Sequence, residues 1–208
     1  VIAGTNAKFP TRYRDAIFLC DWTFATMYAM HLKPDGSSYK GKVDTFVTNT
    51  NGSLALTDVD IGPDGHMYFC VGGRKGQSYL YRVRYVGNES TELSPLDTSS
   101  KHYQARKTRH KLEAFHGKPN PKAIETVWSY LGSDDYHLRY AARIAIEWQD
   151  PKTWADKAYG ETNDLAAIHA LLGLARSDYA GSMQPSIELL PKVGFSKLDK
   201  MGKLALLP

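Results

Sequence analysis

Three side chains in the first hundred residues have the chemistry to hold a ligand. Trp22 lies in the polar stretch 21–24, Asp58 opens an apolar strand-like run, and Arg74 sits in the Gly-rich stretch 72–75. A guanidinium can grip a carboxylate with two parallel hydrogen bonds, and an indole can stack on a planar ligand. If the strands before these stretches are neighbours, the three side chains meet at one rim.

Each of these residues also has a structural interpretation. Arg74 can be an exposed cation that pairs with Asp21 or Asp58, and Trp22 can be a packing aromatic. An aspartate such as Asp58 often accepts hydrogen bonds from nearby backbone N–H groups. The seven histidines form no constellation. We therefore predict Trp22, Asp58 and Arg74 as cofactor-binding candidates, with no catalytic and no metal-binding residue.

Residues 56–85 must position this rim, and they predict three antiparallel strands. The expected strands are Leu56–Ile61, His66–Val71 and Tyr79–Tyr85. Between the first two, Pro63 presets the backbone for a turn and Gly65 tolerates a positive φ. A three-stranded sheet of this size cannot bury both faces alone, so it needs a neighbouring sheet.

Residues 15–32 supply a similar pattern about 50 residues earlier, a spacing typical of propeller blades. Residues 17–20 align with 67–70, each an apolar and aromatic run ending in cysteine, and 27–30 align with 80–83. Chance similarity is the alternative in a strand-rich chain. The repeat favours two consecutive blades. We also expect a turn at residues 33–36 and an outer strand at 43–48.

The excess of positive charge lies in the second half of the chain. Residues 101–208 hold 16 Lys and Arg against 12 Asp and Glu, whereas residues 1–100 hold 10 of each, so the second half accounts for the net +4. The densest run, 101–111, fits a solvated helix face better than a nucleic-acid surface. No apolar run approaches a membrane span. Cys20 and Cys70 are expected to be small buried residues rather than a disulfide.

From about His102 the apolar residues recur at the spacing of an α-helix. Helices are expected at 121–131, 136–149, from 164 onward, 184–193 and 196–207, with Gly132-Ser133-Asp134 and Thr162-Asn163-Asp164 as breaks and caps. In 136–149 the apolar face is flanked by Arg139 and Arg143. Short amphipathic helices separated by tight breaks favour an α-solenoid of paired helices, and a plain helical bundle is the alternative.

These stretches resemble the closing blades of the glucose/sorbosone-dehydrogenase-like propeller. The resemblance rests on residues 16–22, 57–59, 62–65 and 80–85. Residues 112–117 and 138–143 follow in the order seen in planctomycete and verrucomicrobial putative membrane-bound dehydrogenases or haem-binding proteins, which join such a propeller to HEAT-type repeats. The chain departs from sugar-oxidising relatives at Thr23-Phe24, where they carry Asn-Arg. It also contains no Cys-x-x-Cys-His motif for covalent haem.

The fold expected from this resemblance is a β-propeller fragment of about two blades over 1–98, followed by an all-α HEAT-like solenoid over 99–208. The chain begins and ends within apparent elements, so we expect a segment of a longer, exported protein, periplasmic or extracellular.

The function implied by the resemblance is oxidation of a sugar or alcohol with pyrroloquinoline quinone (PQQ) and calcium bound in the full-length protein. Electrons would pass to a c-type haem domain outside this segment, which alone would be inactive. The expected partners are the remaining blades and that cytochrome domain, with no nucleic acid. The alternative is a non-catalytic scaffold that binds protein or polysaccharide.

Overall fold

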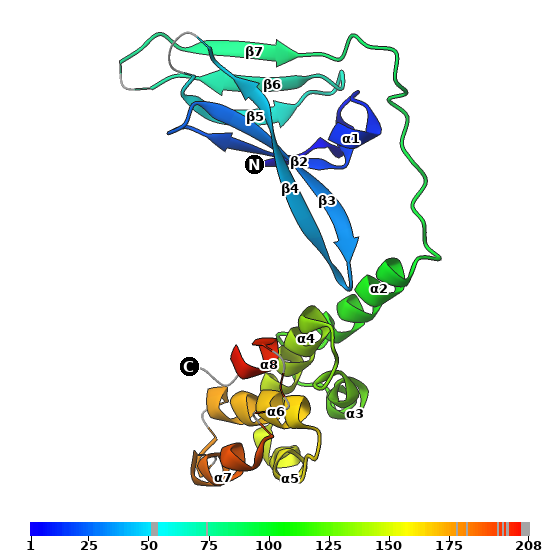
Figure 1. Ribbon diagram of the computed structural model, residues 1–208, viewed down its shortest axis with the longest axis vertical. Helices are drawn as coiled ribbons and strands as arrows, with labels where there is room; N and C mark the ends of the chain where they lie inside the picture. Colours follow the sequence, from blue (N-terminus) through cyan, green and yellow to red (C-terminus); the bar gives the residue numbers. More distant parts are fainter. Residues whose placement is uncertain are drawn as a thin grey trace. The chain divides into compact units, whose positions relative to one another are not determined.

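The computed structural model describes residues 1–50, 54–73, 75–177, 179–181, 183–194, 196, 198 and 200–204 (Figure 1). The chain divides into two compact units. Unit 1 comprises residues 1–35 and 39–97, and unit 2 comprises residues 36–38 and 98–208. Each unit has its own hydrophobic core.

Unit 1 consists of two small sheets. The first has the strand order β1 (Ile2–Ala3), β2 (Ala16–Asp21), β3 (Thr26–Asp35) and β4 (Ser38–Thr48). The second has the order β5 (Leu56–Ile61), β6 (Met67–Val71) and β7 (Tyr79–Val83). A 3₁₀ turn, η1 (Gly4–Asn6), and a one-turn helix, α1 (Thr11–Arg14), connect β1 to β2. The antiparallel register places Phe18 opposite Ala29, and Phe69 opposite Tyr81.

Of the two turns predicted in unit 1, one is found at its predicted place and the other is displaced. Between β5 and β6 the predicted turn is confirmed, with Gly65 at φ +78° and its N–H donating to the Gly62 carbonyl at 2.8 Å. The turn predicted at residues 33–36 is displaced, because β3 continues through Asp35. Gly36, at φ +54°, takes the left-handed conformation instead.

The core of unit 1 lies between the two sheets. Phe18 and Met27 of the first sheet and Met67 of the second are all 0% exposed. Phe69 packs in the same cluster, and Phe46 lies against Phe18 with ring centroids 4.7 Å apart. Each sheet therefore buries one apolar face against the other, as a small antiparallel sheet must.

The predicted propeller fragment is wrong. The strands form two small sheets of unequal size, four and three strands, within a mixed α/β chain. The proposed repeat fails on side-chain parity, because Phe18 is fully buried while its aligned partner Tyr68 is only half-buried. Met27 is likewise buried, whereas its partner Leu80 is 69% exposed. A shift of one residue exchanges the two faces of a strand, so the aligned segments are not structural equivalents.

Unit 2 contains the longer helices. They are α2 (Lys101–Glu113), α3 (Ala123–Val127), α4 (Tyr136–Glu147), α5 (Ala155–Tyr159), α6 (Asp164–Arg176), α7 (Met183–Leu189) and α8 (Lys200–Leu204). The 3₁₀ turns η2 (Trp128–Tyr130), η3 (Pro151–Thr153) and η4 (Leu190–Lys192) interrupt them. The caps are local: Asp135 accepts from the N–H groups of His137 and Leu138, and Asn163 accepts from that of Ala166.

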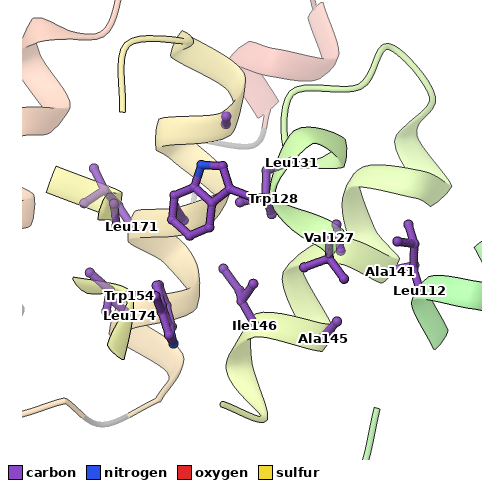
Figure 2. Close-up of a cluster of buried hydrophobic side chains, with 14 of the residues drawn as sticks. Leu112, Val127, Trp128, Leu131, Ala141, Ala145, Ile146, Trp154, Leu171 and Leu174 are labelled. Carbon is purple, nitrogen blue, oxygen red and sulfur yellow. The ribbon is translucent and has the colours of Figure 1, made fainter. Parts of the chain in front are cut away.

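The core of unit 2 includes Trp154, which is 1% exposed (Figure 2). Ile146 of α4 and Leu174 of α6 pack with it, and Gly173 lets the two helices approach, since a Cβ there would lie 3.2 Å from Ile146 and 3.4 Å from Trp154. Figure 2 also shows Leu112 and Val127, which bring α2 and α3 into the same cluster.

The predicted HEAT-like solenoid is also wrong. A solenoid stacks equivalent helix pairs of similar length. Here α4 and α6 have 12 and 13 residues, while α3 and α5 have 5 each. The helix predicted over 121–131 ends at Val127 and continues as a 3₁₀ turn. The helices instead pack around one large cluster, and Ile168, Val193 and Leu198 form a second, smaller one.

Candidate functional site

The structure places two of the three predicted site residues, and both lie on unit 1. Trp22 is 39% exposed in the turn between β2 and β3, where the Asp21 carboxylate accepts from the Phe24 N–H at 2.9 Å. Asp58 is an exposed residue of β5 whose carboxylate accepts from the Val59 N–H at 2.8 Å. Arg74 lies outside the described residues.

Asp58 lies beside the strand that leads into the Trp22 turn. Burial raises the pKa of the Cys20 thiol; the N-terminal ammonium acts in the opposite direction, and the Asp58 carboxylate adds to the rise. β2 contacts β5, and Cys20 precedes Asp21 at the end of β2, so Asp58 of β5 lies near this turn. The turn and the loop between β6 and β7 lie at the same end of unit 1 (Figure 1).

A hollow of about 500 Å³ opens at that end, beside β5, β6 and β7. It is lined by Thr57, Cys70, Val71, Gly72, Gly73, Ser78, Tyr79 and Leu80. Thr57 donates from its hydroxyl to the Cys70 carbonyl at 3.2 Å. Gly72 lies close to Ser78, because a Cβ at residue 72 would come within 2.5 Å of the Ser78 hydroxyl and force it to move. The hollow therefore combines hydroxyls, bare glycine backbone and one large ring.

The ring belongs to Tyr79, which sequence reasoning did not select. Tyr79 is 54% exposed on β7, and its neighbour in the ring cluster, Tyr81, stacks on Phe69 with centroids 5.0 Å apart. The two tyrosine rings lie 6.0 Å apart. The sequence feature that could have identified Tyr79 is an aromatic residue at the start of a strand, directly after a Gly-rich loop. At such a place a ring can stay partly exposed while the next aromatic residue of the strand packs.

Unit 2 has a hollow of about 290 Å³, and Glu161 and Asp164 are the acidic residues of its lining. Glu161 is fully used by the fold: it accepts from the Trp128 Nε1 at 2.7 Å and from the Thr162 and Asn163 N–H groups. Burial alone would raise the pKa of Glu161, but these hydrogen bonds outweigh it and the pKa is lowered. This carboxylate stabilises the start of α6 rather than offering itself to a ligand.

Among the described residues, no group of three or more His, Cys, Asp and Glu side chains is arranged to hold a metal ion. None of the helices within that part of the chain is both long and apolar enough to cross a membrane.

Comparisons with known proteins supply no relative: no family model, curated protein or solved structure matches this chain. The exported location and the neighbouring c-type haem domain stay predictions.

Proposed function

We propose that unit 1 binds a neutral carbohydrate in the hollow beside β5–β7. The single observation that carries the proposal is the composition of its lining: the Tyr79 ring, the hydroxyls of Thr57 and Ser78, and the backbone of Gly72 and Gly73. A sugar presents apolar C–H faces that pack on an aromatic ring, and hydroxyls that exchange hydrogen bonds with hydroxyl and backbone groups.

Further exposed aromatic rings near the hollow support an extended ligand. Trp22 and Phe24, at 39% and 73% exposure, stand in the β2–β3 turn at the same end of unit 1. Exposed aromatic residues gathered at one end of a small unit are typical of a binding surface. A chain of several sugar units would use both the hollow and this turn, so we propose a polysaccharide or oligosaccharide as the ligand.

Quinone-dependent oxidation fits the described rim poorly. PQQ carries carboxylates and needs cations around it, whereas the charged described side chains of the turn, the start of β5 and the β6–β7 loop are Asp21, Asp58 and Lys75. By sequence the rim stretches carry two carboxylates and two cations, Arg74 among them, so they have no excess of positive charge for an anionic cofactor. We therefore derive no oxidative step, and propose binding alone.

Titration calorimetry with soluble oligosaccharides of glucose, mannose and xylose tests the proposal. Tyr79→Ala is expected to weaken binding about tenfold, or ~1.4 kcal/mol, because the stacking surface is lost. Tyr39→Ala is the matched control, since Tyr39 is a similarly exposed tyrosine at 45% on β4. The proposal is wrong if no oligosaccharide binds the intact chain, or if both variants lose affinity equally.

A further inference from the structure

A cluster of buried basic side chains lies between α4 and α6 of unit 2. Arg139 and Arg143, one turn apart on α4, are 4% and 7% exposed, and His169 of α6 is 5% exposed. Helix α4 packs against α6, so the three buried side chains belong to one interface between these helices. Two arginines and a histidine this deeply buried are unusual, because charged groups are rarely buried without partners.

The available negative charge does not balance this cluster. Arg143 pairs with Glu147, and the same carboxylate oxygen also pairs with Arg176 at 3.1 Å. Arg139 donates to the Ser133 carbonyl, and among the described residues no carboxylate forms an ion pair with it. One carboxylate therefore serves two arginines, and a third arginine has only a neutral acceptor.

Three nitrogen atoms of the cluster are buried and have no hydrogen-bond partner among the described residues. They are the Nε of Arg139 and both ring nitrogens of His169. Leaving one buried donor unsatisfied costs about 1–3 kcal/mol, and more when the group is charged. Fully buried polar groups nearly always have a partner, so these three atoms indicate a group that is not part of the described chain.

We propose that Arg139, Arg143 and His169 form a binding site for a small oxyanion of the phosphate class. The planar guanidinium of Arg139 binds two oxygens of the anion, and Arg143 supplies the second positive charge. His169 contributes a neutral N–H donor at pH 7.

Two exposed tyrosines contact the buried arginines. The Arg143 guanidinium lies 5.0 Å from the centroid of the Tyr140 ring, and that of Arg139 lies 5.9 Å from the Tyr136 ring. The two ring centroids are 6.2 Å apart with 30° between the ring planes, and the residues are 45% and 46% exposed. The guanidinium groups thus lie one side chain below the surface, held by cation–π contacts before any anion arrives.

The test adds inorganic phosphate to the full chain at pH 7 and compares it with chloride at equal ionic strength. Phosphate is expected to raise Tm progressively with concentration, as any ligand specific for the folded state does. Arg139→Gln is expected to weaken phosphate binding at least tenfold. Arg12→Gln, which removes an exposed arginine of unit 1, is expected to leave it unchanged.

Nuclear magnetic resonance of the unaltered protein keeps the test independent of how the variants fold. Phosphate is expected to shift the His169 ring resonances and to leave those of the exposed His137 in place. The proposal is overturned if phosphate stabilises Arg139→Gln and Arg12→Gln equally, or if the His169 resonances do not move. Either result would mean that phosphate binds as an adventitious ion only. It is also overturned if phosphate leaves the Tm of the unaltered protein unchanged.

Discussion

His169 makes the stability of unit 2 depend on pH. Burial, with the nearby charges of Arg139 and then Arg143, lowers the pKa of His169 from 6.5 to about 4. Because the folded state takes up its proton only near pH 4 and the unfolded state near 6.5, this residue favours unfolding as the pH falls through that window. Above pH 6.5 it has no such effect.

We expect the free energy of unfolding to fall by about 3 kcal/mol between pH 6.5 and 4 on account of His169. His169→Leu removes the titration and should flatten this part of the profile, measured by urea unfolding in phosphate-free buffer. His137→Gln, which removes an exposed histidine of α4, is the control and should keep the wild-type slope. An unchanged slope in His169→Leu would show that other groups carry the pH dependence.

The two free cysteines should differ in reactivity. Cys70 is exposed in the hollow, whereas Cys20 is half-buried and its pKa is raised, chiefly by burial. Since the thiolate is the nucleophile, we expect a thiol reagent at pH 8 to label Cys70 at least tenfold faster. Mass spectrometry of the labelled peptides measures both rates.

Two single variants assign these rates, because Cys70→Ser should leave only the slow thiol and Cys20→Ser only the fast one. If a sugar occupies the hollow, it should also slow the labelling of Cys70 alone. Equal rates for the two thiols would contradict the difference in burial.

At the scale of the elements, Asp135 does more than cap α4. Its carboxylate accepts from the N–H and hydroxyl of Ser37 at 2.6 and 2.8 Å, in addition to the N–H groups of His137 and Leu138. Ser37 is 0% exposed, so both of its donors depend on this partner. Burial alone would raise the pKa of Asp135, but the hydrogen bonds outweigh it and the pKa is lowered.

Asp135→Ala is expected to lower the free energy of unfolding of unit 2 by about 2–4 kcal/mol, because the cap and both Ser37 bonds are lost. The lowered pKa means that this contribution is complete above the ordinary aspartate pKa of 3.8 and is lost as the pH falls below it. Asp134→Ala, at the exposed neighbouring position, should change stability by less than about 0.5 kcal/mol. Equal losses in the two variants would refute the special role of Asp135. Denaturant unfolding at pH 7 measures both.

Sequence patterns predicted the elements best where a local signal was strong. Strand β5 has its predicted bounds, Leu56–Ile61, and α4 begins at the predicted residue, Tyr136. The blade repeat failed because 16–19 is apolar at every position, so the sequence does not indicate which face of β2 is buried. Only the pairing with β3 and the packing on the second sheet decide it.

The candidate sites were less predictable than the strands. Arg139 and Arg143 were expected beside the apolar face of α4, and the packing of α6 against α4 buries them. Tyr79 and Ser78 gain their place in the hollow from the path of the β6–β7 loop. Burial of a polar residue and the shape of a hollow depend on tertiary packing, which no local pattern encodes.

At the scale of the whole molecule, the two separate cores imply two largely independent folding units. The core of unit 1 centres on Phe18 and that of unit 2 on Ile146, both 0% exposed, and the two clusters share no residue. Truncating a fully buried large side chain costs about 2–5 kcal/mol, and the cost falls on the cooperative unit that contains the cavity.

We therefore expect Phe18→Ala to reduce the hydrogen-exchange protection of β2, β3, β5 and β6 by a factor of about 10² or more, while the amides of α4 and α6 keep theirs. Ile146→Ala should do the reverse, and each variant serves as the control for the other. Because changes in independent clusters add, the double variant should show both losses and no further one. Loss of protection throughout the chain in either single variant would mean that the units unfold together, and the division into two cores would then have no thermodynamic counterpart.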